Sequence, residues 1–242
     1  MSPGASRRSA LALGLAGGAA LLAGCGSVRS ISDATASPVA DPARLPTVAN
    51  RVSTVWSNHP DGPMPLVGDE GTPFDVVLAG APQRPSVQGG ALVGNLPRRP
   101  GAIYVGQQLG SPLHRLGARF GFGAGDSGGS VALVAFTREK PLRANLHLSF
   151  TSDRWILGVI SDGSVDEVAR DFYTNSVPQD GTPVQGEARL DGTTAYVAVP
   201  DGTVRLVDDQ RFTAVAGSLA TWEFFKLTSD SSDVRMYATW AG

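Results

Sequence analysis

DGTTAYVAVPDGTVRLV, residues 191–207, is the stretch that decides the fold class, because it joins two Asp-Gly pairs to two runs of strand-forming residues. Asp-Gly suits a tight turn, since glycine adopts positive φ without steric cost. The run Thr193–Val199 lies between the two pairs, and Thr203–Val207 follows the second pair directly. The stretch therefore predicts an antiparallel hairpin over Asp191–Val207.

The same pattern continues along the rest of the chain. Further Asp-Gly pairs begin at Asp162 and Asp180, and residues 145–150 alternate apolar and polar as a half-buried strand does. One helical spacing occurs, at Ser164–Tyr173, and predicts one or two helical turns. Many short strands with frequent turns predict an all-β fold, an antiparallel β-sandwich. The other predicted strands are Arg119–Phe122, Ser130–Phe136, Trp155–Ile160, Trp222–Leu227, Val234–Trp240 and an edge strand at Phe74–Leu78.

Composition excludes several classes of protein. Of the 242 residues, 42% are hydrophobic and 17% are charged, which is too apolar for a disordered polyampholyte. The chain has 20 basic and 22 acidic residues, so it lacks the positive field that a nucleic-acid partner requires. A single cysteine rules out a disulfide within the chain.

The N-terminus has the features of an export signal. Arg7 and Arg8 precede an uncharged run, Ala10–Ala23, that is rich in Ala, Leu and Gly. As a helix this run spans roughly 21 Å, too short for a hydrocarbon core of about 30 Å. We therefore interpret residues 1–24 as a signal peptide that is removed.

The end of that run, Leu22-Ala23-Gly24-Cys25, resembles the lipobox of bacterial lipoproteins. The resemblance implies that the Cys25 thiol receives a diacylglycerol and that Cys25 becomes the first residue of the mature chain. It places the protein in the cell envelope, on the outer face of the membrane, with the membrane as a partner through a lipid anchor. Residues 6–11 also resemble a twin-arginine signal, although Ala10 replaces its usual Phe, so both export routes stay open.

Composition divides the chain into three predicted segments. Residues 1–24 form the signal peptide, and residues 25–50, rich in Ser, Ala, Asp, Pro and Thr, form a disordered tether. Residues 51–242 form the sandwich domain, of which 51–100 are an irregular part rich in Pro and Gly. Residues 101–242 form its main part.

Residues from about 100 to 242 resemble the concanavalin A-like jelly-roll domains of bacterial and phage surface proteins. The segments that carry the resemblance are LGARFGFG at 116–123, GSVALVAF at 129–136, LHLSFT at 146–151 and ATWEFF at 220–225. The resemblance implies a lectin-like sandwich that binds a glycan or a cell-wall component, or that serves a structural role.

GDSGGS, residues 125–130, copies the nucleophile motif of chymotrypsin-like serine proteases, with Ser127 as the nucleophile. Such an enzyme needs an upstream histidine, held by a buried Asp, to accept the serine proton. Neither His59 nor His114 has the sequence context of that family, and His114 lies only thirteen residues before Ser127. We interpret the motif as a turn between two strands.

No other catalytic constellation is apparent. Glycosidases of jelly-roll type use paired carboxylates on one strand, but no glutamate has an acidic partner at i+2 or i+4 on a predicted strand. The five glutamates are Glu70, Glu139, Glu167, Glu187 and Glu223, and the clustered acids Asp162, Asp166, Glu167 and Asp171 are expected to be solvated. Three isolated histidines and one cysteine give no transition-metal spacing, whereas calcium at turn aspartates stays open. We expect no catalytic residue, metal or cofactor.

The aromatic residues divide into two groups. Trp155 and Trp222 are each in phase with other apolar residues and are expected in the core, whereas Trp240 is the best candidate for an exposed role. His147 lies on the polar phase of its strand and is expected at the surface. The sequence thus predicts a lipid-anchored, non-catalytic, glycan-binding sandwich. The alternative is an envelope hydrolase, either a serine hydrolase using Ser127 or a glycosidase.

Overall fold

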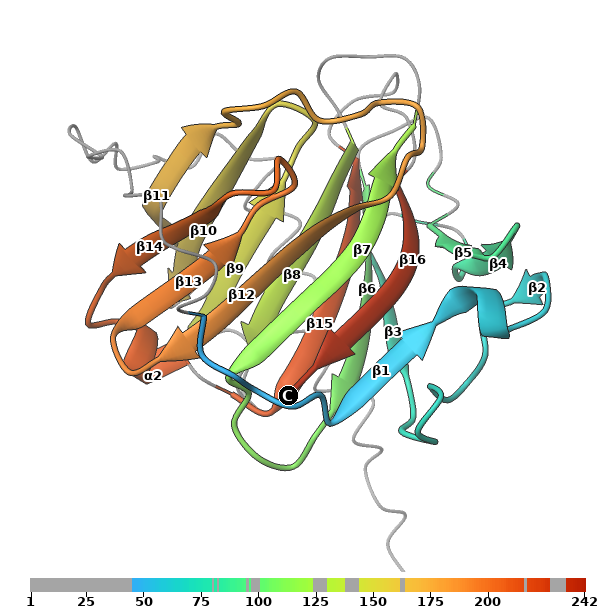
Figure 1. Ribbon diagram of the computed structural model, residues 1–242. Coiled ribbons are helices and arrows are strands. Elements are labelled where there is room, and N and C mark those ends of the chain that lie inside the picture. The colour runs from blue at the N-terminus through green and yellow to red at the C-terminus, as the bar shows by residue number, and fades with distance from the viewer. Residues whose placement is uncertain are drawn as a thin grey trace, which may run out of the picture.

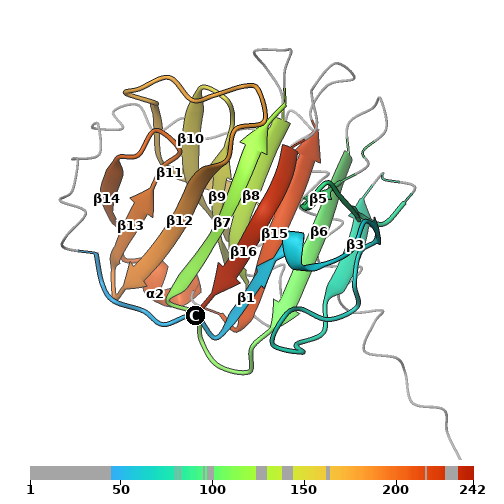
Figure 2. The same ribbon diagram turned by 45° about the vertical axis from the view of Figure 1, so that its right-hand side comes forward.

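The protein is an antiparallel β-sandwich of two packed sheets (Figures 1 and 2). The computed structural model describes residues 45–79, 81, 83–94, 96, 101–123, 130–137, 144–161, 164–215, 217–226 and 234–242. Cys25 and Ser127 lie outside these residues. Among the described residues, no helix is both long and apolar enough to cross a membrane.

The first layer is a nine-stranded sheet, which faces the viewer in Figure 1. Its middle consists of β12, β7 and β16, and β1 pairs with β16. The order is β14 (Val204–Asp208), β13 (Thr194–Ala198), β12 (Val184–Asp191), β7 (Arg115–Phe122), β16 (Val234–Ala241), β5 (Ala91–Val93), β4 (Ser86–Gln88) and β2 (Gly62–Pro63), with β1 (Val52–Val55) beside β16.

The second layer is a seven-stranded sheet behind the first. Its order is β11 (Ser164–Phe172), β10 (Arg154–Ser161), β9 (Ala144–Phe150), β8 (Ser130–Thr137), β15 (Leu219–Lys226), β6 (Gly101–Gln108) and β3 (Asp75–Ala79). Two short helices, η2 (Trp56–Asn58) and α2 (Phe212–Val215), complete the described elements.

The core lies between the two sheets, where alternate residues of each strand meet. Phe120 of β7 stacks on Phe150 of β9 with ring centroids 5.6 Å apart, and both side chains are fully buried. Trp222 of β15 donates its indole N–H to the Gly117 carbonyl of β7, 2.9 Å away. This contact across the layers fixes which side of β15 faces the core and which side faces outward.

Most predicted strands are confirmed. The Asp191–Val207 hairpin is formed by β13 and β14 with the end of β12, and Gly192 and Gly202 have φ of 59° and 85°. The predicted edge strand is β3, which pairs with β6 alone. It is one of five short strands within residues 51–100.

The predicted helical turns at Ser164–Tyr173 are wrong. This segment is β11, which pairs with β10 along its length. A register shift opposite Leu157 and Gly158 breaks the alternation of side chains, so the apolar residues acquire a spacing that resembles a helix. The ladder of hydrogen bonds that β10 offers decides the conformation.

Candidate functional site

The outward side of β15 carries the most unusual polar cluster of the structure. Trp222 faces the other sheet, so its neighbour Glu223 points away from the core. Glu223 lies opposite Tyr104 of the adjacent strand β6. From β9, the Nε2 of His147 lies 3.5 Å from Oε2 of Glu223. Three strands thus bring an acid, a phenol and an imidazole together.

Glu223 is buried, with only 2% of its surface exposed. Burial raises the pKa of its carboxyl, because desolvation disfavours the ionised form, while the neighbouring His147 and Tyr104 side chains oppose that shift. Burial also raises the pKa of the Tyr104 phenol, and the nearby charge of Glu223 adds to the effect. The site therefore favours a neutral carboxyl beside a neutral phenol.

Two polar atoms on this side of β15 are buried without a hydrogen-bond partner in the described part of the chain. They are Oε1 of Glu223 and Oγ1 of Thr221, which sit two residues apart on the same face. An unpaired buried polar group costs on the order of 1 to 3 kcal/mol. A ligand hydroxyl could reach these atoms only if the residues around them moved, because Glu223 and Thr221 are each 2% exposed.

A buried apolar cluster adjoins the polar cluster. Ala102, Tyr104 and Phe225 form a small hydrophobic cluster separate from the main core, with Val77 and Ala79 of β3 packed against it. Phe225 is outward like Glu223, because it lies two residues further along β15. The outward side of β15 and β6 therefore combines hydrogen-bonding groups with apolar side chains, both of them buried.

One cross-strand row connects this cluster to the far edge of the sheet. Paired positions run from β11 to β3, all on the outward side by their register with Glu223. In order they are Arg170, Ile156, Ser149, Glu223, Tyr104 and Val77, with β8 between Ser149 and Glu223. We call these positions the outward row.

An exposed aromatic residue stands at the β11 end of the outward row. Phe172 is 62% exposed, and the guanidinium of Arg154 lies 4.9 Å from its ring centroid. Arg154 is held in place by two hydrogen bonds to the carboxylate of Asp153, of 3.1 and 2.9 Å. The ring of Phe172 thus exposes a flat apolar surface to solvent, and its neighbour Arg154 constrains the position of that ring.

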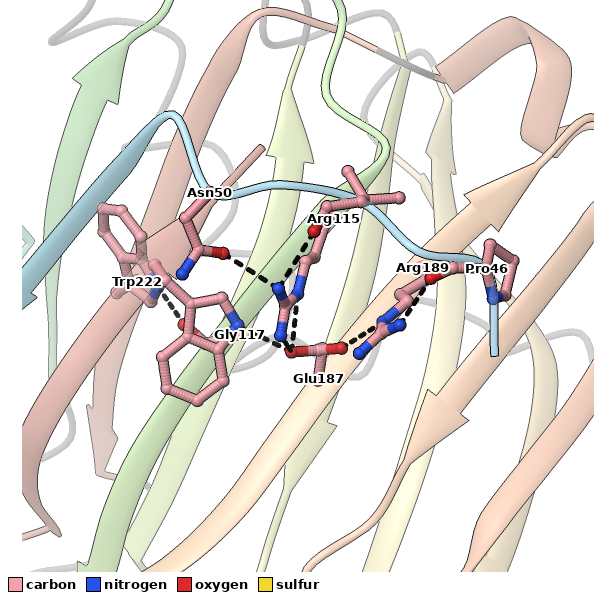
Figure 3. A network of polar contacts seen from close by, with 9 residues as sticks. Pro46, Asn50, Arg115, Gly117, Glu187, Arg189 and Trp222 are labelled. Atoms are coloured by element: carbon pink, nitrogen blue, oxygen red, sulfur yellow. Dashed lines mark hydrogen bonds and ion pairs between the residues drawn. The ribbon is translucent and has the colours of Figure 1, made fainter. Parts of the chain in front are cut away.

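A second polar network lies on the outward side of the nine-stranded sheet (Figure 3). Glu187, 1% exposed, accepts hydrogen bonds from Arg115 at 2.9 and 2.8 Å, from Arg189, and from the Trp240 indole at 2.6 Å. Every charge of this cluster has a partner, which is the arrangement expected of a structural network.

Trp240 is not exposed, contrary to expectation. It is 9% exposed and lies flat against Gly117, where a Cβ atom would come within 2.5 Å of its ring. Trp155 and Trp222 are buried in the core as predicted. His147 faces outward as its strand phase indicates, but it contacts Glu223 and its side chain is only 12% exposed, so it is not a plain surface residue.

The candidate protease residues are only partly described. His59 Nε2 lies 2.8 Å from Asp69 Oδ1, and His114 is exposed. Asp69 also accepts hydrogen bonds from Val55 N and Asn58, so the pair of His59 and Asp69 holds the loop around Asp69 against β1. Since Ser127 falls outside the described residues, its interpretation as a turn residue stays a prediction.

The remaining acids have separate roles. Asp166, Glu167 and Asp171 all lie on β11, but each pairs with a different arginine: Arg211 at 3.5 Å, Arg170 at 3.2 Å and Arg205 at 3.7 Å. Glu70 accepts a hydrogen bond from Ser53 N at 2.6 Å. Asp162 and Glu139 are not among the described residues, which contain no group of three His, Cys, Asp or Glu that could hold a metal ion.

Comparison with known proteins identifies the fold but no family. No family model matches the chain, and no curated protein matches it. Solved structures with the same fold include SCLam, a non-specific endo-β-1,3(4)-glucanase of family GH16, with a TM-score of 0.55, 10% identity and coverage of 85% of this chain and 95% of that one. A native glycosidic hydrolase has a TM-score of 0.53 and 10% identity, with coverage of 81% of this chain and 98% of that one. The exoplasmic/lumenal domain of VIP36 has a TM-score of 0.50 and 10% identity, with coverage of 78% of this chain and 88% of that one.

These structures confirm the concanavalin A-like jelly-roll fold and overturn one expectation. The chain was expected not to be an enzyme, because its sequence shows no catalytic pair. That conclusion is wrong as drawn, since a glucanase and a glycosidic hydrolase share the fold at about the same similarity as VIP36 does. Absence of a motif therefore does not exclude catalysis on this scaffold.

Proposed function

We propose that this protein binds a carbohydrate chain along the outward row of the seven-stranded sheet. The observation that carries the proposal is the ring of Phe172, 62% exposed at one end of the row, and the polar group of Glu223, Thr221 and His147 supports it. Sugar hydroxyls both donate and accept hydrogen bonds, so they match this mixture of carboxyl, hydroxyl and imidazole groups.

The length of the outward row and the side chains along it also suit a sugar chain. From β11 to β6 the outward row crosses five strand spacings, roughly 24 Å at the usual separation of neighbouring strands. Exposed Phe172 at one end gives an apolar ring on which the C–H face of a sugar can stack. The carbohydrates in the neighbours' own structures, such as Man3GlcNAc bound to VIP36, support this class of ligand.

We further propose that the domain is held at the outer face of the membrane by a lipid on Cys25. The support is the sequence alone: the single cysteine of the chain ends its single signal-like segment. A lipid anchor would keep the domain among the glycans of the cell envelope.

Binding is tested with the full-length protein against β-1,3- and β-1,4-glucan oligosaccharides, mannose oligosaccharides and muropeptides, by calorimetry. Phe172→Ala and Glu223→Ala should each weaken the dissociation constant about tenfold, which corresponds to about 1.4 kcal/mol. Leu66→Ala is the matched control, because Leu66 is 73% exposed on a loop away from the row. The proposal fails if the wild-type protein binds none of these sugars, or if Leu66→Ala weakens binding as much as Phe172→Ala.

A second candidate is hydrolysis of a glycosidic bond with Glu223 as the proton donor. The observation that favours it is the raised pKa of this buried carboxyl, since a general acid must keep its proton near neutral pH. The groups that act on the carboxyl are His147 and Tyr104 rather than a second carboxylate. Release of reducing ends from the bound sugar should fall at least a hundredfold in Glu223→Gln; release by that variant at the wild-type rate excludes Glu223 as the acid.

A further inference from the structure

Three polar side chains are buried inside the sandwich, beside the loop formed by residues 64–74. They are Thr54 of β1, Thr239 of β16 and Gln107 of β6, and none is more than 1% exposed. Thr54 is in phase with Val52, which belongs to the core, and it lies directly opposite Thr239, so both threonines point inward. The interior of the sandwich is therefore polar at this place.

The loop brings polar groups of both sheets together. A Cβ atom added to Gly68 of this loop would lie 2.7 Å from Thr54 Oγ1 and 2.8 Å from Gln107 Nε2, so both groups border the same point. Gln107 points inward as well, because it pairs with Ala220, a core residue of β15. Its Nε2 donates a hydrogen bond to the carbonyl of Thr72 in the loop, 3.0 Å away. Gln107 thus reaches from the seven-stranded sheet toward β1.

One oxygen on each of the three side chains has no hydrogen-bond partner in the described part of the chain. These oxygens are Oγ1 of Thr54, Oγ1 of Thr239 and Oε1 of Gln107. A buried polar atom without a partner is costly, and proteins commonly satisfy such atoms with an internal water. Two of the neighbouring side chains are small, since Ala118 lies opposite Thr239 and Ala220 lies opposite Gln107. Polar groups and small neighbours are the conditions that such a water needs.

We infer that one internal water molecule binds between Thr54 Oγ1, Thr239 Oγ1 and Gln107 Oε1. Each hydroxyl can donate to the water oxygen, and the water can donate to the amide oxygen, which only accepts. Three hydrogen bonds are the usual number for a buried water. Two hydrogen bonds through one water span roughly 5.5 Å, and Thr54 and Gln107 are within that reach because both border Gly68.

This water connects the two sheets beneath the loop. Because β1 and the loop belong to the irregular part of the domain, residues 51–100, the water attaches that part to the main sandwich. None of the three side chains carries a charge, so the site suits a neutral water rather than a metal cation, which prefers carboxylates. The site lies inside the sandwich and is independent of the proposed glycan surface.

Substitutions of similar shape give opposite results for a bound water and for an unsatisfied hydroxyl. Thr54→Val and Thr239→Val each replace a hydroxyl with a methyl group. If the hydroxyls hold a water, each substitution leaves the water short of a partner and should lower the melting temperature of the full-length protein by about 2 to 4 °C. If the hydroxyls have no partner, the same substitutions should raise the melting temperature. Thr193→Val is the matched control, because Thr193 is exposed at the turn before β13, and it should leave the melting temperature unchanged.

A shared water also makes the two substitutions depend on each other. The double variant should lose clearly less than the two single losses combined, because the first substitution already releases the water. A high-resolution crystal structure of the full-length protein should show one density peak within about 2.6 to 3.2 Å of all three oxygens, and the double variant should lack it. A raised melting temperature in either single variant, strictly additive losses, or a wild-type structure without this peak overturns the inference. A peak that rubidium replaces would identify a cation and would also overturn it.

Discussion

Glu223 shows what a single buried acid does to stability. Its pKa is raised from the usual 4.5 by burial, so the folded state binds its proton more tightly than the unfolded state does. The stability that this residue contributes is fully present below about pH 4.5 and is lost as the pH rises through the raised pKa.

Glu223→Gln should therefore be more stable than the wild type at pH 8, by at least about 1 kcal/mol, and the two should converge at pH 4. Gln keeps the shape of the side chain but cannot ionise. Urea denaturation between pH 4 and pH 8 measures the difference. A variant that is less stable than the wild type at pH 8 would show that ionised Glu223 is held well by His147.

Gly186 shows how closely the two sheets approach. A Cβ atom there would lie 2.3 Å from a ring carbon of Phe150, in the middle of the core. Gly186→Ala should cost about 1 to 3 kcal/mol through overpacking. The matched control is Gly106→Ala on β6, where the nearest atom is 3.4 Å from the added Cβ. Thermal unfolding of both variants compares them; equal melting temperatures would mean that Phe150 moves aside freely.

The environments of Glu223 and Gly186 could not have been recognised from the sequences of their own strands. Glu223 has no acidic partner along β15, because the side chains that act on it, His147 and Tyr104, lie on two other strands. Strand phase correctly placed His147 on an outward face. What the sequence could not supply was the order of strands, which puts β8 between β9 and β15 and β6 on the other side.

At the scale of elements, local turn chemistry was the most reliable signal. Asp-Gly turns predicted β13 and β14, because the glycine conformation depends on two or three adjacent residues. The strand β6 was missed, since nearly all of Gly101–Gln108 is buried and shows no alternation. The β11 segment was mistaken for a helix because its strand pairing lies outside its own sequence.

The Glu187 network should be essential for holding β7, β12, β16 and residues 46–50 together. Glu187→Gln removes the charge that faces two arginines, and breaking a buried ion pair on one side typically costs about 3 to 5 kcal/mol. Glu167→Gln is the control, because its pair with Arg170 lies at the surface and should contribute less than about 1 kcal/mol. Chemical denaturation at pH 7 compares the variants; similar losses would place the stability of this region elsewhere.

At the scale of the whole molecule, the two sheets divide the surface into two different sides. One carries residues 46–50 and the arginines around Glu187, and the other carries the outward row with its buried acid. The fold class was predictable because many short strands permit few architectures. The difference between the two sides was not predictable, because it depends on which sheet residues 46–50 contact.

The proposed location at the membrane depends on the thiol of Cys25, which lies outside the described residues. If a lipid is attached there, Cys25→Ala should leave an unprocessed precursor or release the protein from the membrane fraction, since a thiol is the nucleophile that alkylation requires. Detergent partitioning and intact-mass measurement of wild type and variant report the outcome. Ser27→Ala is the control, because it changes a nearby residue without removing the thiol. A Cys25→Ala protein that is cut at the same bond and still partitions into detergent would exclude the lipid anchor, and the domain would then need another means of staying near the proposed glycan.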